Sequence, residues 1–181
     1  ARQAFEQIPW IRSALVRREF PNRLSVTLDE FSPVAQWNVE GDGKFLSTEG
    51  IVFEVNADEV ETDSLPLLKG PEAQAKAVLE MYQFLKPLLN KMDMRIDKLE
   101  LSQRGSWSAL LESGASLELG HGSQQEVGER LQIFFKTLTQ VSSRYGRTAT
   151  SLLSADVRYE NGYALRLRGV STVVPESLKK L

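Results

Sequence analysis

The sequence contains no cysteine and a single histidine among its 181 residues. Without cysteine the chain forms no disulfide, no thiolate zinc site and no cysteine nucleophile. Its 22 basic and 24 acidic residues give a formal net charge of −2, so it lacks the broad positive field that attracts nucleic acid or anionic lipid. No apolar run approaches the roughly 20 residues of a membrane-spanning helix, and no signal peptide opens the sequence.

The one histidine, His121, lies between two glycines. A catalytic base needs a nucleophile or an orienting partner, and neither a Gly-x-Ser-x-Gly motif nor a metal-ligand spacing accompanies it. We predict a solvated loop histidine, with an anion held by the glycine-flanked turn as the second interpretation. Pairs of carboxylates elsewhere lie in polar stretches typical of a solvated surface. The sequence therefore predicts neither an enzyme nor a cofactor or metal site.

Hydrophobic residues make up 41% of the chain, which is enough for a folded core. Two stretches carry them at helical spacing. Residues 71–90 start with a proline, which suits the first helical position, and Pro87 is expected to kink or shorten the last turns. The second helix starts at Ser123, whose spacing from Glu126 is that of a capping box, and Gly146 suits its end.

Most other apolar residues alternate with polar ones, which predicts strands. Residues 24–28 are predicted to have one buried and one solvated face. The predicted strands cover residues 10–18, 24–28, 44–47, 51–55, 96–103, 107–111 and 115–119. Residues 1–8 are expected to form a helix, Pro33 to interrupt the chain, and residues 59–66 to form an acidic loop. The predicted fold class is α+β, with a sheet of mainly antiparallel strands packed against two long helices.

The stretch 153–168 is predicted to form the last hairpin of the sheet. Asn161-Gly162 between alternating flanks favours a tight two-residue turn. The alternation places Tyr163, Leu165 and Leu167 on one face of the second strand, and Ala164, Arg166 and Arg168 on the other. As the last strand of its sheet, it would offer its outer backbone groups to a strand of another chain. The alternative is a strand capped by the chain's own tail.

Seven runs of the sequence resemble a known family. They are Pro9-Trp10-Ile11, Val16-Arg17-Arg18-Glu19-Phe20-Pro21, Leu24-Ser25-Val26-Thr27-Leu28-Asp29-Glu30, Pro33-Val34-Ala35-Gln36-Trp37-Asn38, Leu65-Pro66-Leu67-Leu68-Lys69-Gly70-Pro71-Glu72, Arg104-Gly105-Ser106-Trp107 and Asp156-Val157-Arg158-Tyr159. Through these runs the chain resembles the bacterial cell-division family FtsQ, called DivIB in other bacteria. The resemblance extends from near the start of the chain to the last hairpin.

The resemblance implies a domain organisation and a location. Residues 1–32 would be the C-terminal half of a POTRA domain, residues 33–170 an FtsQ-type β domain, and residues 171–181 a C-terminal tail. A cytoplasmic tail, one membrane-spanning helix and the first POTRA strand and helix would precede this stretch. The family is anchored in the inner membrane by that helix, with the part seen here in the periplasm at the division septum.

The resemblance also implies a function. Members are non-enzymatic scaffolds of the divisome that link early and late division proteins controlling septal peptidoglycan synthesis. The implied partners are FtsB and FtsL, bound through the C-terminal edge strand, to which FtsB adds a strand, and other divisome proteins, bound through the POTRA segment. The implied partner-binding residues are Arg104, Arg158, Tyr159, Asn161 and Gly162, together with Tyr163, Leu165 and Leu167 of the edge strand.

The chemistry of these positions suits the implied role. Arg104 and Arg158 suit bidentate pairing with partner carboxylates, and Tyr159 suits a rigid aromatic anchor. Solvated arginines and a tyrosine packed on the second helix are the alternatives. Some members carry tryptophan where this chain has Leu167, which offers less contact area.

Two other functions stay open at this point. The alternative to the scaffold is an extracytoplasmic domain that binds cell-wall peptidoglycan, which would show a cleft with convergent acids or stacked aromatic rings. A module for export or assembly of membrane proteins would explain the N-terminal segment, but it would leave the long β domain without a role.

Overall fold

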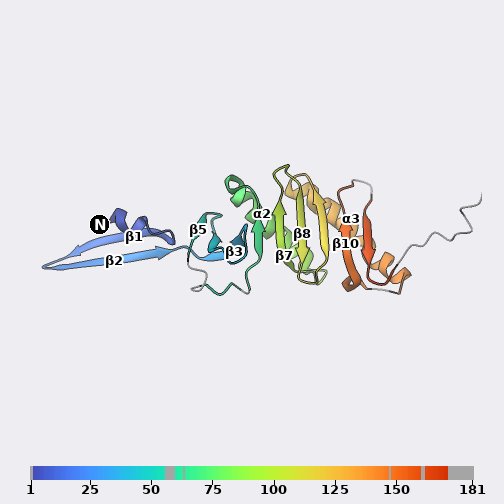
Figure 1. The fold of residues 1–181 in the computed structure, drawn as a ribbon, viewed down its shortest axis with the longest axis horizontal. Coiled ribbons are helices and arrows are strands. Elements are labelled where there is room, and N and C mark those ends of the chain that lie inside the picture. Colours follow the sequence, from blue (N-terminus) through green and yellow to red (C-terminus); the bar gives the residue numbers. More distant parts are fainter. Residues whose placement is uncertain (1, 56–59, 63, 147, 160–161, 171–181) are drawn as a thin grey trace, which may run out of the picture.

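The structure is a computed structural model that describes residues 2–55, 60–62, 64–146, 148–159 and 162–170. Its strands form two sheets. A two-stranded hairpin occupies one end of an elongated molecule, and a nine-stranded sheet with two long helices makes up the rest (Figure 1). The predicted α+β fold is confirmed.

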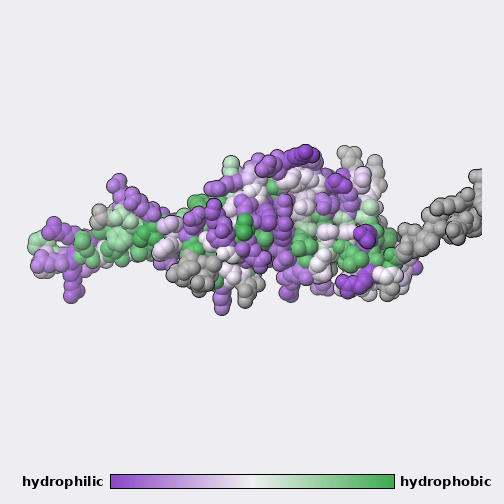
Figure 2. Space-filling view, in the orientation of Figure 1, coloured by the Kyte–Doolittle hydropathy of each residue, from purple (hydrophilic) through white to green (hydrophobic). Residues whose placement is uncertain are grey.

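The N-terminal hairpin consists of α1 (Arg2–Glu6), β1 (Ile11–Glu19) and β2 (Arg23–Glu30). The predicted order of helix, strand, turn and strand is correct, but the predicted buried face of the second strand is not. Leu24 is 67% exposed, and Val26 and Leu28 are each 39% exposed. A one-turn helix beside β1 supplies too little apolar surface to cover a two-stranded ribbon. Figure 2 shows the resulting apolar surface along the hairpin.

Nine strands form the large sheet, in the spatial order β11-β10-β9-β8-β7-β6-β3-β4-β5. Their bounds are β3 (Pro33–Trp37), β4 (Lys44–Ser47), β5 (Val52–Glu54), β6 (Leu67–Lys69), β7 (Ile96–Leu101), β8 (Trp107–Leu111), β9 (Ser116–Gly120), β10 (Leu152–Asp156) and β11 (Ala164–Leu167). Pairing is antiparallel except for β3 with β6, β6 with β7, and β9 with β10. Pro33 begins a strand instead of interrupting one, as proline does at a first strand position.

Two long helices, α2 (Ala75–Asn90) and α3 (Gln124–Arg144), cover one face of this sheet. Figure 1 shows them behind the strands. Pro71 is not the first helical residue, as was predicted, but an extended residue ahead of the 3₁₀ turn η2 (Glu72–Gln74), so α2 begins only at Ala75. The helix continues through Pro87 without being shortened. The capping box of Ser123 with Glu126 forms as predicted. A second 3₁₀ turn, η3 (Ala149–Ser151), leads into β10.

The core lies between the helices and the sheet. Its largest fully buried side chains are Trp37, Phe45, Phe134, Leu46, Leu68, Leu85, Leu89, Leu99, Leu117, Leu119, Leu131 and Leu138. In β8 the covered face alternates with the open one, so Trp107 and Ala109 are buried while Ser108 is half-buried. In β3 and β4, by contrast, three successive residues of each strand are buried. The core extends to the last strand of the sheet, since Leu167 is only 4% exposed.

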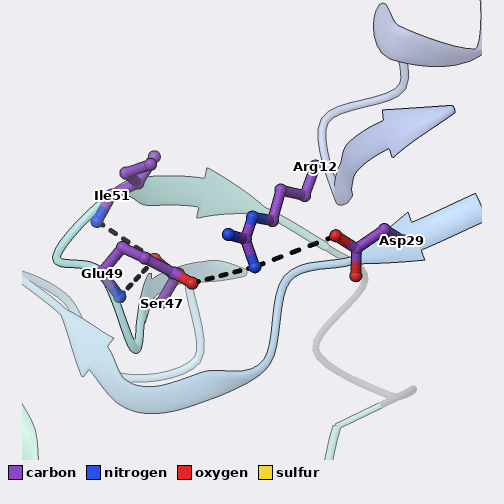
Figure 3. Close-up of polar contacts among 5 residues, drawn as sticks. All are labelled: Arg12, Asp29, Ser47, Glu49 and Ile51. Atoms are coloured by element: carbon purple, nitrogen blue, oxygen red, sulfur yellow. Dashed lines mark hydrogen bonds and ion pairs between the residues drawn. The ribbon is translucent and has the colours of Figure 1, made fainter.

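The hairpin meets the large sheet at a small polar and aromatic junction. Nη1 of Arg12, on β1, lies 3.1 Å from Oε1 of Glu49 and 3.8 Å from Oδ2 of Asp29 (Figure 3). The turn that carries Glu49 is held by the buried hydroxyl of Ser47, which accepts hydrogen bonds of 3.2 Å from the backbone N–H groups of Glu49 and Ile51. The hydrogen bonds made by Thr48 and Ser47 lower the pKa of Glu49, and Arg12 adds to the effect.

Candidate partner-binding edge

Strand β11 lies at the end of the nine-stranded sheet, as the sequence predicted. It runs antiparallel to β10, with Asp156 opposite Ala164 and Leu152 opposite Leu167. Among the strands that the structure describes, none pairs with the outer side of β11. The backbone N–H and C=O groups on that side are therefore positioned for the addition of another strand.

The inward face of this edge is fixed to helix α3 and to the core. The hydroxyls of Tyr163 and Thr137 are hydrogen-bonded at 2.6 Å, and the Tyr163 ring meets Phe134 edge-on at a centroid distance of 5.1 Å. Leu167 is buried, and Leu165 is half-buried against the core. The opposite face carries the exposed residues Ala164, Arg166 and Arg168. The predicted division of faces is confirmed, and it leaves Leu167 able to offer a partner its backbone but not its side chain.

The predicted two-residue turn at Asn161-Gly162 is not what joins the last two strands. The connection spans residues 157–163, and Gly162 does not adopt a positive φ. Val157 is buried and its backbone N–H donates to the carbonyl of Glu118, so the chain follows β9 for one residue beyond β10. Asn161 lies outside the described residues.

Arg158 follows the end of β10, and its guanidinium is paired with Asp156. Its Nε donates to Oδ1 of Asp156 at 2.9 Å and its Nη2 to Oδ2 at 2.6 Å, and the backbone N–H of Arg158 also donates to Oδ1 at 3.2 Å. These hydrogen bonds lower the pKa of Asp156 and raise the pKa of Arg158. The side chain of Arg158 remains 51% exposed. Because a guanidinium has five N–H donors, the two nitrogens bonded to Asp156 leave Nη1 unoccupied by this pair.

Tyr159 and Arg104 are both exposed. Tyr159 is 60% exposed, which contradicts the alternative that it packs on the second helix. Arg104 projects from the loop between β7 and β8, and it takes part in none of the ion pairs among the described residues. The loop itself is tightly bonded, because the hydroxyl and carbonyl of Ser102 accept from the backbone N–H groups of Ser106 and Gly105 at 3.0 and 2.9 Å.

These exposed side chains lie at one end of the sheet. Trp107 at the start of β8 pairs with Gly120 at the end of β9, and β10 runs parallel to β9, so the Arg104 loop and the connection after β10 share an edge. The Arg104 loop begins two strands from β10, which is about 10 Å at the usual spacing of neighbouring strands. Arg104 and Arg158 therefore come from the same end of the sheet, two strands apart.

The loop that contains His121 braces this end of the sheet. Nη2 of Arg130, on α3, donates to the carbonyls of Leu119 and His121 at 2.8 and 2.6 Å, and Nε1 of Trp107 donates to the carbonyl of Gly122 at 3.3 Å. His121 itself is exposed, as predicted. Within the described residues no group of three or more His, Cys, Asp or Glu side chains is arranged to hold a metal ion.

Sequence reasoning missed two residues of this site. Asp156 stands two positions before Arg158 at the end of a strand, where side chains at i and i+2 share a face, so the spacing itself was a usable signal. Gly120 ends β9 directly beneath the Arg158 side chain, a proximity that depends on the parallel pairing of β9 with β10. No local sequence pattern predicts that these two strands pair.

Two surface hollows lie at the opposite end of the sheet. One of about 550 Å³ is lined by Asn90, Asp93, Met94, Arg95, Glu112 and Ser113, and a second of about 400 Å³ shares Asn90, Arg95 and Glu112 with it. Their charges are mixed, and the one aromatic residue in their linings, Tyr82, is buried. Within the described ranges, no helix is both long and apolar enough to cross a membrane.

Comparison with known proteins identifies the family. The model of the cell division protein FtsQ/DivIB C-terminal region matches residues 35–158, and that of the FtsQ-type POTRA domain matches residues 1–31. The cell division protein FtsQ of Thiomonas arsenitoxydans is 38% identical over 172 residues, which cover 94% of this chain and 62% of the relative. That of Burkholderia pseudomallei is 35% identical over 171 residues, which cover 94% and 66%.

A more distant relative extends the likeness. The cell division protein FtsQ of Neisseria gonorrhoeae is 31% identical over 167 residues, which cover 92% of this chain and 64% of the relative. The chain thus spans between 62% and 66% of the length of these curated relatives. Both family models and all three relatives agree along nearly the whole chain. The chain therefore belongs to the FtsQ/DivIB family of bacterial cell-division proteins.

Proposed function

We propose that this chain is the partner-binding part of a non-enzymatic divisome scaffold, which binds FtsB and FtsL through the outer side of β11. The observation that carries the proposal is an edge strand anchored from below and flanked by exposed Arg158 and Tyr159. A strand fixed by Tyr163, Leu165 and Leu167 does not need to be ordered when a partner strand arrives, which lowers the entropic cost of binding.

Two kinds of contact contribute to the proposed binding at this edge. Main-chain hydrogen bonds along β11 supply affinity that tolerates changes of side chain, so the leucine at position 167 is compatible with strand addition. Specificity comes from the end of the sheet, where Tyr159 acts as an aromatic anchor and Arg104 and Arg158 pair with acidic residues of the partner. Asn161 and Gly162 lie in the connection that leads into the edge strand and complete the proposed partner-binding set.

The rest of the chain has a supporting role in this proposal. Residues 1–32 contact other divisome proteins as part of a POTRA domain, residues 33–170 form the docking domain, and residues 171–181 are its tail. The whole protein is held in the inner membrane by one helix outside this chain, with the docking domain in the periplasm at the septum. By holding its partners there, the scaffold links early and late division proteins that control septal peptidoglycan synthesis.

Binding of cell-wall peptidoglycan is the second candidate, and a hollow of about 430 Å³ where the hairpin meets the large sheet is its best location. Trp10, Phe31 and Phe53 line this hollow together with Glu30 and Glu61, and Phe31 stacks on Phe53. The edge of the sheet carries the stronger proposal, because its exposed side chains are those that the family resemblance implies for partner binding.

Calorimetric titration with the extracytoplasmic C-terminal peptide of FtsB tests the proposal. We expect saturable binding that Tyr159→Ala and Arg104→Glu each weaken by more than tenfold, or about 1.4 kcal/mol. The matched controls are Phe20→Ala, which removes an exposed ring at the tip of the N-terminal hairpin, and Arg95→Glu, at the opposite end of the large sheet. Both should leave the affinity within twofold. Absence of binding by the unaltered chain would overturn the proposal and leave peptidoglycan binding as the function to test next.

A further inference from the structure

Two neighbours hold the Arg158 side chain in one orientation. The Asp156 carboxylate accepts from Nε and Nη2 in a bidentate arrangement and from the Arg158 backbone as well. Beneath the side chain lies Gly120, where an added Cβ would approach Cγ of Arg158 to 2.9 Å and Cβ to 3.3 Å. The carboxylate thus fixes the head of the arginine, and the missing side chain of Gly120 makes room for its stem.

Surface exposure indicates that this arrangement does little for stability. The side chains of Arg158 and Asp156 are 51% and 22% exposed, and ion pairs at such positions contribute little to folding. A flexible arginine that is ordered before binding, however, loses less conformational entropy when a partner arrives. We therefore expect the Asp156–Arg158 pair to contribute more to partner binding than to folding stability.

The held side chain stays at the end of the sheet that also carries Tyr159 and the Arg104 loop. Gly120 belongs to β9, so the stem of Arg158 lies over the end of that strand. With its head bonded to Asp156 and its stem over β9, Arg158 keeps Nη1 as the part of the guanidinium that this pair leaves for an acidic side chain of the partner.

We propose that Asp156 and Gly120 are positioning residues that hold Arg158, at this end of the sheet, in the orientation that receives an acidic side chain of the partner. This inference rests on the proposed function. Asp156 takes the Nε side of the guanidinium, so the partner's carboxylate is received on the Nη1 side. Asp156 acts through Arg158 and does not itself touch the partner.

The test is a double-mutant cycle with the FtsB peptide, comparing Asp156→Asn, Arg158→Ala and the double variant. We expect Asp156→Asn to weaken binding about fivefold to tenfold, Arg158→Ala at least as much, and the double variant no more than Arg158→Ala alone. The thermal midpoint of Asp156→Asn should change by less than about 3 °C. A purely structural role would lower stability and affinity together.

Gly120→Ala supplies the second arm, with Gly114→Ala as its control. Both glycines have positive φ, 78° and 82°, but an added Cβ at Gly114 meets nothing within 4 Å. Both variants should lose stability from backbone strain, and only Gly120→Ala should lose affinity for the peptide.

The outcomes separate this inference from the function on which it rests. Failure of the unaltered chain to bind the peptide overturns the proposed function and the positioning role together. Binding by the unaltered chain that Asp156→Asn leaves equal or tighter overturns the positioning role alone. The positioning role alone is also overturned if Asp156→Asn lowers the affinity as much in the Arg158→Ala background as in the unaltered chain. Asp156 would then act independently of the arginine.

Discussion

The molecule has unpaired strand edges at both ends, and they differ in what lies beneath them. The N-terminal hairpin is two strands and one short helix, so Leu24, Val26 and Leu28 face solvent although their pattern is that of a buried face. At the other end, β11 rests on α3 through Tyr163 and Leu167, and it exposes alanine and arginines instead of large apolar residues.

In the proposed function, β11 is a defined docking surface because a second layer fixes it. Among the described residues, the short helix α1 is the layer against the hairpin, so the hairpin edge keeps high apolar exposure and little sets the register of an incoming strand (Figure 2). The β11 edge has its register set by the core and its sides marked by charges, which discourage unspecific pairing.

Removing the anchor of β11 should have the largest effect. Leu167→Ala deletes a side chain that is 4% exposed, and we expect it to lower the free energy of unfolding by about 2 to 4 kcal/mol. Leu24→Ala is the matched change in the hairpin, where the leucine is 67% exposed, and it should cost less than about 0.5 kcal/mol. Urea unfolding of both variants decides the matter. Equal losses would show that the two edges are supported alike.

The contrast also explains which features the sequence predicted. The two helices, the meander of β7, β8 and β9 and the edge position of β11 follow from local periodicity and from what comes last in the chain. The exposed Leu24 face was predicted wrongly because alternation reports which residues are apolar and not whether a layer covers them. Two features of the candidate site could be predicted: the edge strand from the sequence pattern, and Tyr159 from the family resemblance.

The features that the sequence did not predict depend on pairing between distant parts of the chain. Strand β6 has only three residues and is recognised by its parallel neighbours β3 and β7, which lie 30 residues or so to either side in sequence. The Asn161-Gly162 pattern predicted a tight turn, yet the pairing of β10 with β11 ends at Asp156 and Ala164. The closeness of Gly120 to Arg158 likewise needs the β9–β10 pairing, which no local signal encodes.

A bulkier residue at position 164 should separate affinity from stability at the proposed docking edge. Ala164→Ile places a branched side chain on the exposed face of β11, beside the position of an added strand, and isoleucine favours strands. We expect the thermal midpoint to stay equal or rise, while affinity for the FtsB peptide falls about threefold to tenfold. Unchanged affinity would show that no partner side chain crosses this position. Leu153→Ile, at a partly exposed position of β10, is the control for β-branching.

Acid should weaken the Asp156–Arg158 pair, and the pair's contribution to stability should fall as the pH falls. Hydrogen bonds from Arg158 lower the pKa of Asp156 below its usual 3.8, so folding favours the ionised carboxylate. Its contribution to stability is therefore fully present above about pH 4 and is lost as the pH falls through the lowered pKa. The difference in thermal midpoint between the unaltered chain and Asp156→Asn should be small and constant from pH 5 to 7, and should shrink toward pH 3. A difference that grows toward pH 3 contradicts this sign.

The smallest effect is expected at the junction, where the hairpin meets the supported sheet through Arg12. Its ion pairs with Glu49 and Asp29 are exposed, so Arg12→Ala should leave the thermal midpoint nearly unchanged. It should instead broaden the range of hairpin orientations, because the turn that presents Glu49 is rigidly held by Ser47. Spin labels on Asn22→Cys and Ser116→Cys can measure this by pulsed electron resonance, since the chain has no other cysteine.

We expect a wider distance distribution for Arg12→Ala than for the unaltered chain, and no widening for Arg17→Ala, an exposed arginine further along the same strand. High salt should reproduce the effect of Arg12→Ala, because salt screens exposed charges. If Arg12→Ala and high salt both leave the distribution unchanged, the stacking of Phe31 on Phe53, with ring centroids 5.2 Å apart, is sufficient to fix the hairpin. The N-terminal edge would then be as well oriented as β11, and the contrast between the two ends would reduce to the layer beneath each strand.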